Sequence, residues 1–205
     1  PRVGGVVGVS GGALFVNADT ATKESTGGKA TIYGLALTVL TNAAASSGVG
    51  GLVGRAENSI YAYNLTVTGD ANDKKVFGQT GTAKFKNVGG IAGYITSNSE
   101  FKFDTCEVSN VDLESREVSG GISGNISGNA FGSPVVTCNN VKVSGVTFGS
   151  SYAGGINGSL GSTPTFNITN TVIKNNVFKN PSNTWENPKN SNNKSRSGGL
   201  SGDGR

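Results

Sequence analysis

The sequence predicts an all-β fold, a right-handed parallel β-helix (β-solenoid) of roughly five to six irregular coils with three short strands per coil. Three observations predict it. A glycine-centred hexad recurs six times in the 205 residues, short runs with a two-residue apolar period follow the hexads, and Gly or Asn separates these runs. Because one such unit cannot bury its apolar side chains alone, its neighbours must stack on it. We therefore expect a single β-solenoid domain over residues 1–205.

The hexad has the pattern small, Gly, Gly, aliphatic, small, Gly. It occupies residues 3–8, 49–54, 88–93, 119–124, 153–158 and 197–202. From one first glycine to the next the steps are 46, 39, 31, 34 and 44 residues, so the unit varies in length. The paired glycines are predicted to be structural, because glycine permits a positive φ at a corner or a close approach of two backbones. They are Gly4, Gly5, Gly50, Gly51, Gly89, Gly90, Gly120, Gly121, Gly154, Gly155, Gly198 and Gly199.

The strands are predicted in the β-branched and aromatic runs that follow the hexads. These runs cover residues 60–67, 101–108, 135–138 with 141–143, and 166–173. A third short run closes the unit at residues 111–113, 146–148 and 177–178. The unequal steps indicate loops near residues 17–29, 69–86 and 179–195. Since connecting segments run over the surface of a domain, we expect all three loops to be exposed.

The composition excludes several classes of protein. Apolar residues make up only 35% of the chain. A disordered chain combines low hydrophobicity with high net charge, but here only 15% of the residues are charged and the net charge is +4, so the composition does not fit a disordered chain. The 17 Lys and Arg residues are scattered among 13 Asp and Glu residues, so we expect no nucleic-acid partner. No apolar run reaches the length of about 18 residues that spans a bilayer, so we expect no membrane insertion by this segment.

Both ends of the sequence fall inside a hexad, and neither shows a polar or helical cap. Open coil ends would leave backbone groups unpaired. The chain also contains no Met and starts with Pro. These features indicate a segment of a longer chain or a stackable subunit. The expected partners are flanking solenoid coils or other copies of the chain, end to end.

The two cysteines occupy similar places in successive units. Cys106 follows Gly89 by 17 residues, and Cys138 follows Gly120 by 18 residues. Stacked strands bring such positions within about 5 Å of each other, inside the range that a disulfide allows. Two interpretations fit: a disulfide, or a pair of small buried side chains stacked in the interior.

The chain shows no recognisable catalytic or metal site. It contains no His, which excludes a Ser-His-Asp triad and an H-E-x-x-H zinc site on this segment. The densest acidic stretch contains Asp104, Glu107 and Asp112, and we interpret it as a solvated face that pairs with Lys102 and Lys142. We therefore predict no catalytic residue, no metal ligand and no cofactor.

Aromatic residues are the candidates for contact with a ligand. Trp185, in the Asn-rich loop, is the candidate for contact with a glycan, because an aromatic ring can stack on a sugar, and the alternative is that it covers a loop or fills a corner. Tyr61, Tyr63, Tyr94 and Tyr152 could serve in the same way, but such residues more often cover loops or fill corners.

The hexads, above all those at residues 49–54 and 88–93, resemble the GLUG repeat of bacterial surface and secreted proteins. That repeat occurs in large adhesin-like chains and beside the protease domain of extracellular immunoglobulin A proteases. The resemblance covers most of the chain and implies an extracellular or cell-surface location. It implies no catalytic residue within the repeat.

Three functions follow as expectations. The first is a structural or adhesive stalk of a surface or secreted protein, with a glycan or a host surface protein as partner. The second is a subunit that polymerises head to tail into an extracellular filament. The third, which the missing His and the scattered carboxylates disfavour, is a carbohydrate-active β-helix enzyme. We predict that the chain is not an enzyme.

Overall fold

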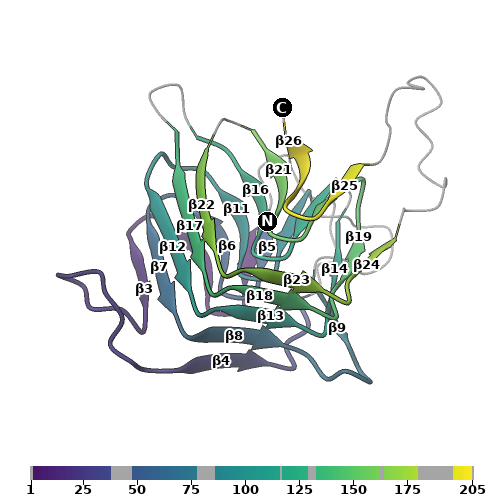
Figure 1. Cartoon of the computed structure of the whole chain (residues 1–205), viewed down its shortest axis with the longest axis horizontal. Helices are drawn as coiled ribbons and strands as arrows, with labels where there is room; N and C mark the ends of the chain where they lie inside the picture. Colours follow the sequence, from purple (N-terminus) through teal and green to yellow (C-terminus); the bar gives the residue numbers. More distant parts are fainter. Residues whose placement is uncertain are drawn as a thin grey trace.

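The computed structural model describes residues 2–37, 48–77, 86–115, 117–128, 133–161, 164–179 and 196–204. Within these ranges the chain is all β and contains no helix (Figure 1). All pairings between its named strands are parallel. The expected all-β class is therefore confirmed, and the parallel sheets are compatible with a β-helix or solenoid.

The strands form five sheets, which we number in the order in which the chain visits them. Sheet 1 contains β1 (Arg2–Gly4), β5 (Gly48–Gly50), β10 (Asn87–Gly89), β15 (Val118–Gly120), β20 (Tyr152–Gly154) and β25 (Arg196–Gly198). Sheet 2 contains β2 (Val7–Ser10), β6 (Val53–Ala56), β11 (Ala92–Ile95), β16 (Ser123–Ile126), β21 (Asn157–Leu160) and β26 (Ser201–Gly204). Sheet 3 contains β3 (Leu14–Val16), β7 (Ile60–Tyr63), β12 (Glu100–Asp104), β17 (Val135–Asn139) and β22 (Thr165–Thr169).

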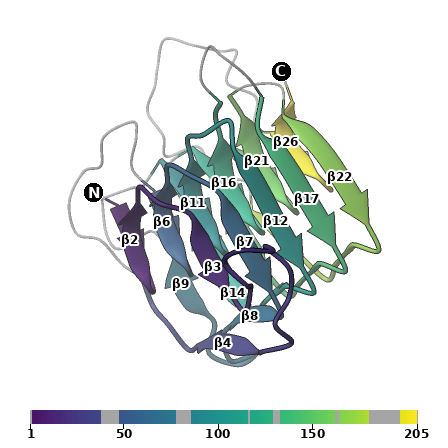
Figure 2. The same ribbon diagram turned by 90° about the vertical axis from the view of Figure 1, so that its left-hand side faces the viewer.

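The two remaining sheets have five and four strands. Sheet 4 contains β4 (Ala30–Tyr33), β8 (Leu65–Thr68), β13 (Glu107–Ser109), β18 (Lys142–Ser144) and β23 (Val172–Lys174). Sheet 5 contains β9 (Lys75–Phe77), β14 (Val111–Glu114), β19 (Thr147–Gly149) and β24 (Val177–Lys179). The chain passes through the sheets in the same order in each unit, so strands of a sheet lie side by side in sequence order (Figure 2).

The number of strands per unit differs from the expected three. The set from β10 to β14, like the set from β15 to β19, places one strand in each of five sheets. Two bends account for the difference. The hexad bends at its second glycine and the aliphatic residue that follows, so it supplies a strand to sheet 1 and another to sheet 2. The run at 60–67 bends at Asn64, whose φ is 49°, so it supplies strands to sheets 3 and 4.

Corners with a left-handed backbone recur at the same place in successive units. Between sheets 3 and 4 they are formed by Asn64, Thr105, Asn140 and Asn170, with φ between 48° and 54°. Asn adopts this conformation more readily than other side-chain residues, because its short amide can bond to nearby backbone. Thr105 is the exception, since a β-branched residue is unfavourable there. Between sheets 4 and 5 the corners use Asn110, Gly145 and Asn175.

The hexad glycines allow backbones to touch, and none of the twelve paired glycines has a positive φ. A Cβ on Gly120 would lie 2.0 Å from the carbonyl oxygen of Ser123 and 2.5 Å from the nitrogen of Gly158. A Cβ on Gly121 would lie 2.0 Å from the carbonyl oxygen of Gly155. Any larger residue would push apart either the bend within a hexad or two stacked hexads. The repeated glycines are thus required by close approach rather than by unusual φ.

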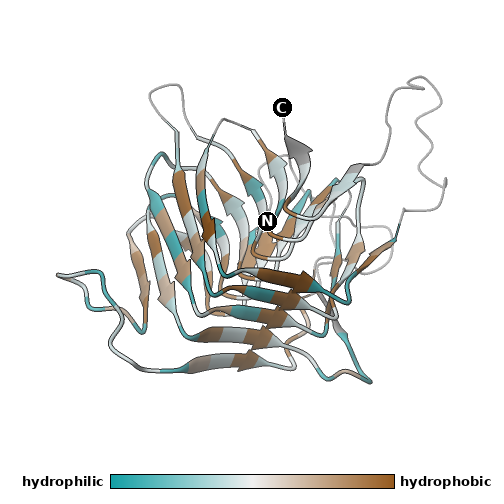
Figure 3. Cartoon of the chain, viewed as in Figure 1, coloured by the Kyte–Doolittle hydropathy of each residue, from teal (hydrophilic) through white to brown (hydrophobic). Residues whose placement is uncertain are grey.

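The interior is filled by apolar side chains that stack from strand to strand. In sheet 5 the column consists of Phe77, Leu113, Phe148 and Phe178, and in sheet 3 Ile60, Phe101 and Val136 follow one another. These strands alternate apolar and polar residues along their length (Figure 3). The alternation directs one set of side chains into the core and the other to the outer face of each sheet.

Candidate ligand-contact face outside sheet 3

The outer face of sheet 3 carries the aromatic and charged side chains that alternate with its core residues. In register, Tyr61 lies beside Lys102, and Tyr63 lies beside Asp104. Further along the same rows lie Thr137 with Asn167, and Asn139 with Thr169. The neighbouring residues Ile60, Ala62, Phe101 and Phe103 are packed in the core. Strand alternation therefore places a ladder of ring, ammonium, carboxylate, amide and hydroxyl groups on one surface.

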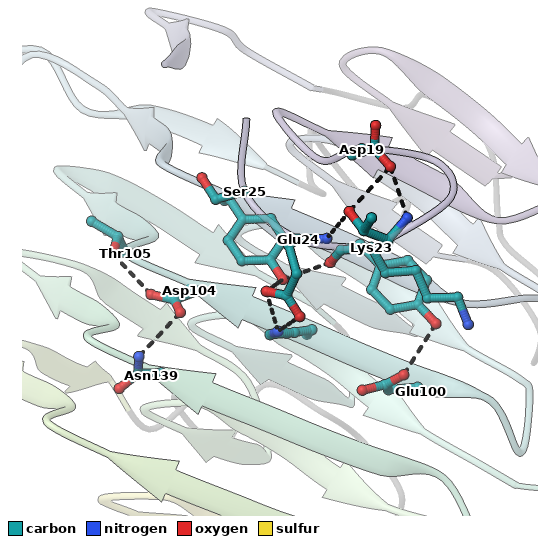
Figure 4. Close-up of polar contacts among 12 residues, drawn as sticks. Asp19, Lys23, Glu24, Ser25, Glu100, Asp104, Thr105 and Asn139 are labelled. Atoms are coloured by element: carbon teal, nitrogen blue, oxygen red, sulfur yellow. Dashed lines mark hydrogen bonds and ion pairs between the residues drawn. The ribbon is translucent and has the colours of Figure 1, made fainter. Parts of the chain in front are cut away.

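A segment that we call the strap, residues 17–29, connects β3 to β4 and crosses this face (Figure 2). The Tyr63 hydroxyl donates to the Lys23 carbonyl at 2.7 Å. Lys102 Nζ donates to both carboxylate oxygens of Glu24 at 3.2 Å (Figure 4). The base of the strap is held by Asn17, whose Nδ2 donates to the Tyr63 carbonyl at 2.7 Å. The loop expected near residues 17–29 thus lies on the surface, and it bonds to the neighbouring strands.

The strap covers two tyrosine rings. Tyr61 and Tyr63 point outward but are only 3% and 4% exposed. Phe15 stacks on Tyr61 with ring centroids 5.4 Å apart, and Lys23 Nζ lies 5.4 Å from the centre of the Tyr61 ring. Lys102 Nζ lies 5.2 Å from the centre of the Tyr63 ring. Cations at these distances are attracted to the faces of the rings.

Tyr63 and Lys102, the two titratable residues beneath the strap, both have raised pKa values. Burial raises the pKa of the Tyr63 phenol above its ordinary value, and the neighbouring Glu24 carboxylate adds to this effect. The hydrogen bond to Tyr63 raises the pKa of the Lys102 ammonium, and Glu24 raises it further. At neutral pH Tyr63 is therefore a neutral hydroxyl donor and Lys102 a full positive charge.

Beside the strap, a polar ladder continues along the same face without a cover. Asn139 Nδ2 donates to Asp104 Oδ2 at 3.1 Å, and the Thr169 hydroxyl donates to Asn139 Oδ1 at 2.7 Å. The Thr105 hydroxyl donates to the other oxygen of Asp104 at 2.9 Å (Figure 4). These groups are exposed or half-buried, so a ligand can reach them.

The acidic stretch singled out in the sequence is divided among three sheets. Asp104 ends a strand of sheet 3, Glu107 begins a strand of sheet 4, and Asp112 lies in sheet 5. The expected ion pair between Glu107 and Lys142 is confirmed, with 2.7 Å between Oε1 and Nζ. Lys102 instead pairs with Glu24 of the strap. In the part of the chain that the structure describes, no three His, Cys, Asp or Glu residues are grouped to hold a metal ion.

The cysteines differ in position from the sequence expectation. Cys138 lies in β17 opposite Phe103, whereas Cys106 lies at the corner before β13. From the pairing of Glu107 with Lys142, the residue stacked on Cys106 is Val141. Both cysteines are buried free thiols. Burial raises the pKa of Cys106 to about 11 and that of Cys138 to about 12, so both side chains are inert, neutral core residues.

The remaining aromatic candidates are not gathered on sheet 3. Trp185 lies outside the described residues, as do parts of the loops expected near residues 69–86 and 179–195. Tyr94 lies on sheet 2, where Arg55 approaches its ring at 5.9 Å, and Tyr152 lies in sheet 1. Sequence reasoning named Tyr61 and Tyr63 only within a general set. The alternation of these two tyrosines with core residues could have identified them as outward-facing. Nothing in the sequence indicated that the strap covers them.

Comparison with known proteins finds no matching family model, no matching curated protein and no matching solved structure. A search of the described residues for a helix long and apolar enough to cross a membrane finds none.

Proposed function

We propose that this chain is a segment of an extracellular right-handed β-helix of about five to six coils, serving as a stalk or adhesin of a cell-surface or secreted protein. The observation that carries the proposal is the continuous parallel register from β1 to β25 in sheet 1 and from β2 to β26 in sheet 2. A stack that repeats in this way builds a stiff rod rather than a pocket. At the spacing of β-strands, such a rod would be roughly 25–30 Å long.

The hexad chemistry supports the same role. At Gly90, Gly121 and Gly155 the nearest atom to an added Cβ would be a backbone carbonyl oxygen of the next hexad along the stack, followed by the side chain of a core residue. Each unit thus fits closely against its neighbour. The resemblance of the hexads to the GLUG repeat supports the extracellular location and the adhesin-like setting.

The location is tested by labelling intact source cells and their medium with an antibody raised against the folded chain. We expect signal on intact cells or in the medium without permeabilisation. Signal that appears only after permeabilisation, with none in the medium, would contradict the proposal. An antibody against an internal protein controls for cell integrity.

The alternative role, a subunit that polymerises head to tail, is favoured by exposed apolar side chains at the two ends of the stack. Val6 is 65% exposed and Leu200 is 51% exposed, whereas the equivalent hexad residues Leu52 and Ile156 are 4% and 1% exposed. Phe178 ends the column of sheet 5 and is 38% exposed. Another copy stacked in register would cover these side chains.

Gly199→Ala separates the two roles. Nothing lies within 4 Å of a Cβ on Gly199, but at the equivalent Gly121 the next hexad lies 2.0 Å away. If copies stack as the internal units do, this substitution blocks the stacking and leaves the single chain folded. Solution mass against concentration, with electron microscopy, measures the result. A chain that stays monomeric at all concentrations contradicts the filament role.

A further inference from the structure

The strap is a preformed unit that keeps its shape by its own hydrogen bonds. Asp19 Oδ1 accepts from the backbone nitrogens of Ala21 at 2.9 Å and Thr22 at 2.7 Å. These bonds hold the pKa of Asp19 below its ordinary value, so the carboxylate is fully charged at neutral pH. Within the strap, Asp19 N also donates to the Glu24 carbonyl at 2.9 Å, and Ala18 bridges to Ser25 in antiparallel fashion. The strap can therefore move as one body.

The attachment of the strap tip to sheet 3 is polar and open to solvent. Residues 19–27 are all exposed, so no apolar strap side chain is buried on the sheet. The ion pair between Glu24 and Lys102 has side chains that are 67% and 23% exposed. Salt screens an exposed pair of this kind. The tip is thus latched by Glu24 and by the bond from Tyr63 to the Lys23 carbonyl.

The two ends of the strap turn through residues with a left-handed backbone. Asn17 has a φ of 52° and Gly27 a φ of 78°, both in the left-handed region. The base stays attached through Asn17 and through Asn64, whose Nδ2 donates to the Gly28 carbonyl at 3.0 Å. A fixed base, a rigid body and a weak tip latch together describe a cover that can open.

The surface beneath the tip has the chemistry of a sugar-binding face. Two outward tyrosine rings, Tyr61 and Tyr63, offer apolar ring surface, although Phe15 of β3 stacks on one face of Tyr61. The Tyr61 hydroxyl donates to Glu100 Oε2 at 3.1 Å. The ladder of half-buried Asp104 and Asn139 and exposed Thr169 adjoins them. A pyranose presents an apolar C–H face for stacking on a ring and hydroxyl groups for carboxylate, amide and hydroxyl partners.

We propose that the strap is a latched cover over a saccharide-binding face formed by Tyr61, Tyr63 and the ladder of Asp104 and Asn139. Opening breaks the contacts of Glu24 and Lys23, exposes both rings and frees the Lys102 ammonium for the ligand. The proposal rests on the adhesive form of the proposed function. Its tests differ from the labelling of cells, so either idea can fail while the other stands.

Nitration of tyrosine by tetranitromethane, followed by peptide mass spectrometry on the full chain, tests the cover. Tyr33 is 65% exposed and serves as the internal standard. At low salt we expect Tyr33 to react and Tyr61 and Tyr63 to be protected. Glu24→Gln, or high salt, should raise nitration of Tyr61 and Tyr63 several-fold relative to Tyr33.

The matched control is Glu57→Gln, which removes another exposed ion-pair carboxylate, 3.0 Å from Arg55, on sheet 2. This variant should leave the nitration of Tyr61 and Tyr63 unchanged. Equal protection of the two rings in the original chain and in Glu24→Gln would overturn the latch. An equal rise in both variants would also overturn it, because the opening would then be general.

A shortened strap tests the ligand class. Replacing residues 19–24 by Asn-Gly retains Ala18 and Ser25 and closes them with a two-residue hairpin turn. We expect this variant to bind saccharides on a broad oligosaccharide array more strongly than the original chain. Adding Tyr63→Ala should abolish the binding while circular dichroism stays unchanged. If the shortened variant binds saccharides no more strongly than the original chain, the assignment of a saccharide ligand is wrong. If binding survives Tyr63→Ala, the ligand does not bind at the proposed face.

Discussion

Replacing the second glycine of an internal hexad by alanine should destabilise the fold, whereas the same change in the last hexad should not. A Cβ on Gly121 would lie 2.0 Å from the carbonyl oxygen of Gly155 and 2.7 Å from Val143 Cγ1. Ordinary van der Waals contact begins at 3.4 Å, so the oxygen is 1.4 Å too close. Because this oxygen belongs to the backbone of the next hexad, two stacked strands must move apart. A methyl group on Gly199 would meet nothing within 4 Å.

The magnitude follows from the packing. Overpacking a tight interior costs about 1–3 kcal/mol, and a backbone clash belongs at the upper end, about 3 kcal/mol. For a chain of this size, each kcal/mol lowers Tm by about 2–4 °C. Gly121→Ala should therefore lower Tm by about 6–12 °C. Gly199→Ala should stay within about 0.5 kcal/mol of the original chain, as exposed substitutions do.

Thermal unfolding followed by circular dichroism, at low protein concentration, measures both values. Low concentration matters because Gly199 is also the position at which a second copy would stack. Equal Tm values for the two variants would refute the view that close backbone approach explains the hexad. A large loss of Tm in both variants would place the constraint in the bend of the hexad rather than in the stacking.

Three further predictions concern the core, a corner and the thiols. Phe148→Ala should cost about 3–5 kcal/mol in urea unfolding, because its ring is fully buried, and Phe178→Ala, 38% exposed, should cost clearly less. Thr105→Asn should raise stability by up to about 1 kcal/mol in the same assay, since Asn tolerates a φ of 54° better than a β-branched residue, and a lower stability would argue against strain there. The thiols of Cys106 and Cys138 should resist alkylation at pH 8 until urea is added. Because their folded pKa values, about 11 and about 12, exceed the ordinary 9.0, their contribution to stability is complete below pH 9 and is lost as pH rises toward 11 and 12. The Cys106→Ala, Cys138→Ala double variant should lose that part of the pH slope.

The general architecture could be predicted because its signals are local. The Gly-Gly hexads mark where backbones must touch, and the alternation in Phe101, Lys102, Phe103 and Asp104 marks a strand with one buried face. The split into five sheets was missed. Each bend depends on the φ of single residues such as Asn64, and Asn occurs in many other conformations.

The candidate site was harder to predict, because its parts are distant in sequence. Glu24 and Lys102 are 78 residues apart, and nothing near either residue identifies the other. From the sequence we expected Lys102 to pair with the acidic stretch around Asp104. Lys102 and Asp104 do lie on the same outer face of β12, but the strap crosses that face and Lys102 pairs with Glu24 instead. The cysteine alignment failed for a similar reason. Counting from the glycines ignores loops of different length, and the register pairs Cys138 with Phe103.

From the sequence alone, the repeated glycines, the short alternating strands and the absence of His determined a parallel all-β stack with no His-dependent chemistry. These properties follow from side-chain size, residue type and the spacing of residues along the chain, all of which can be read directly from the sequence. Only the tertiary structure decided that Glu24 latches onto Lys102, that Tyr61 and Tyr63 are covered, and that Cys106 stacks on Val141. Those facts depend on the register between units and on the path of a loop. Both are set by the packing of the whole stack.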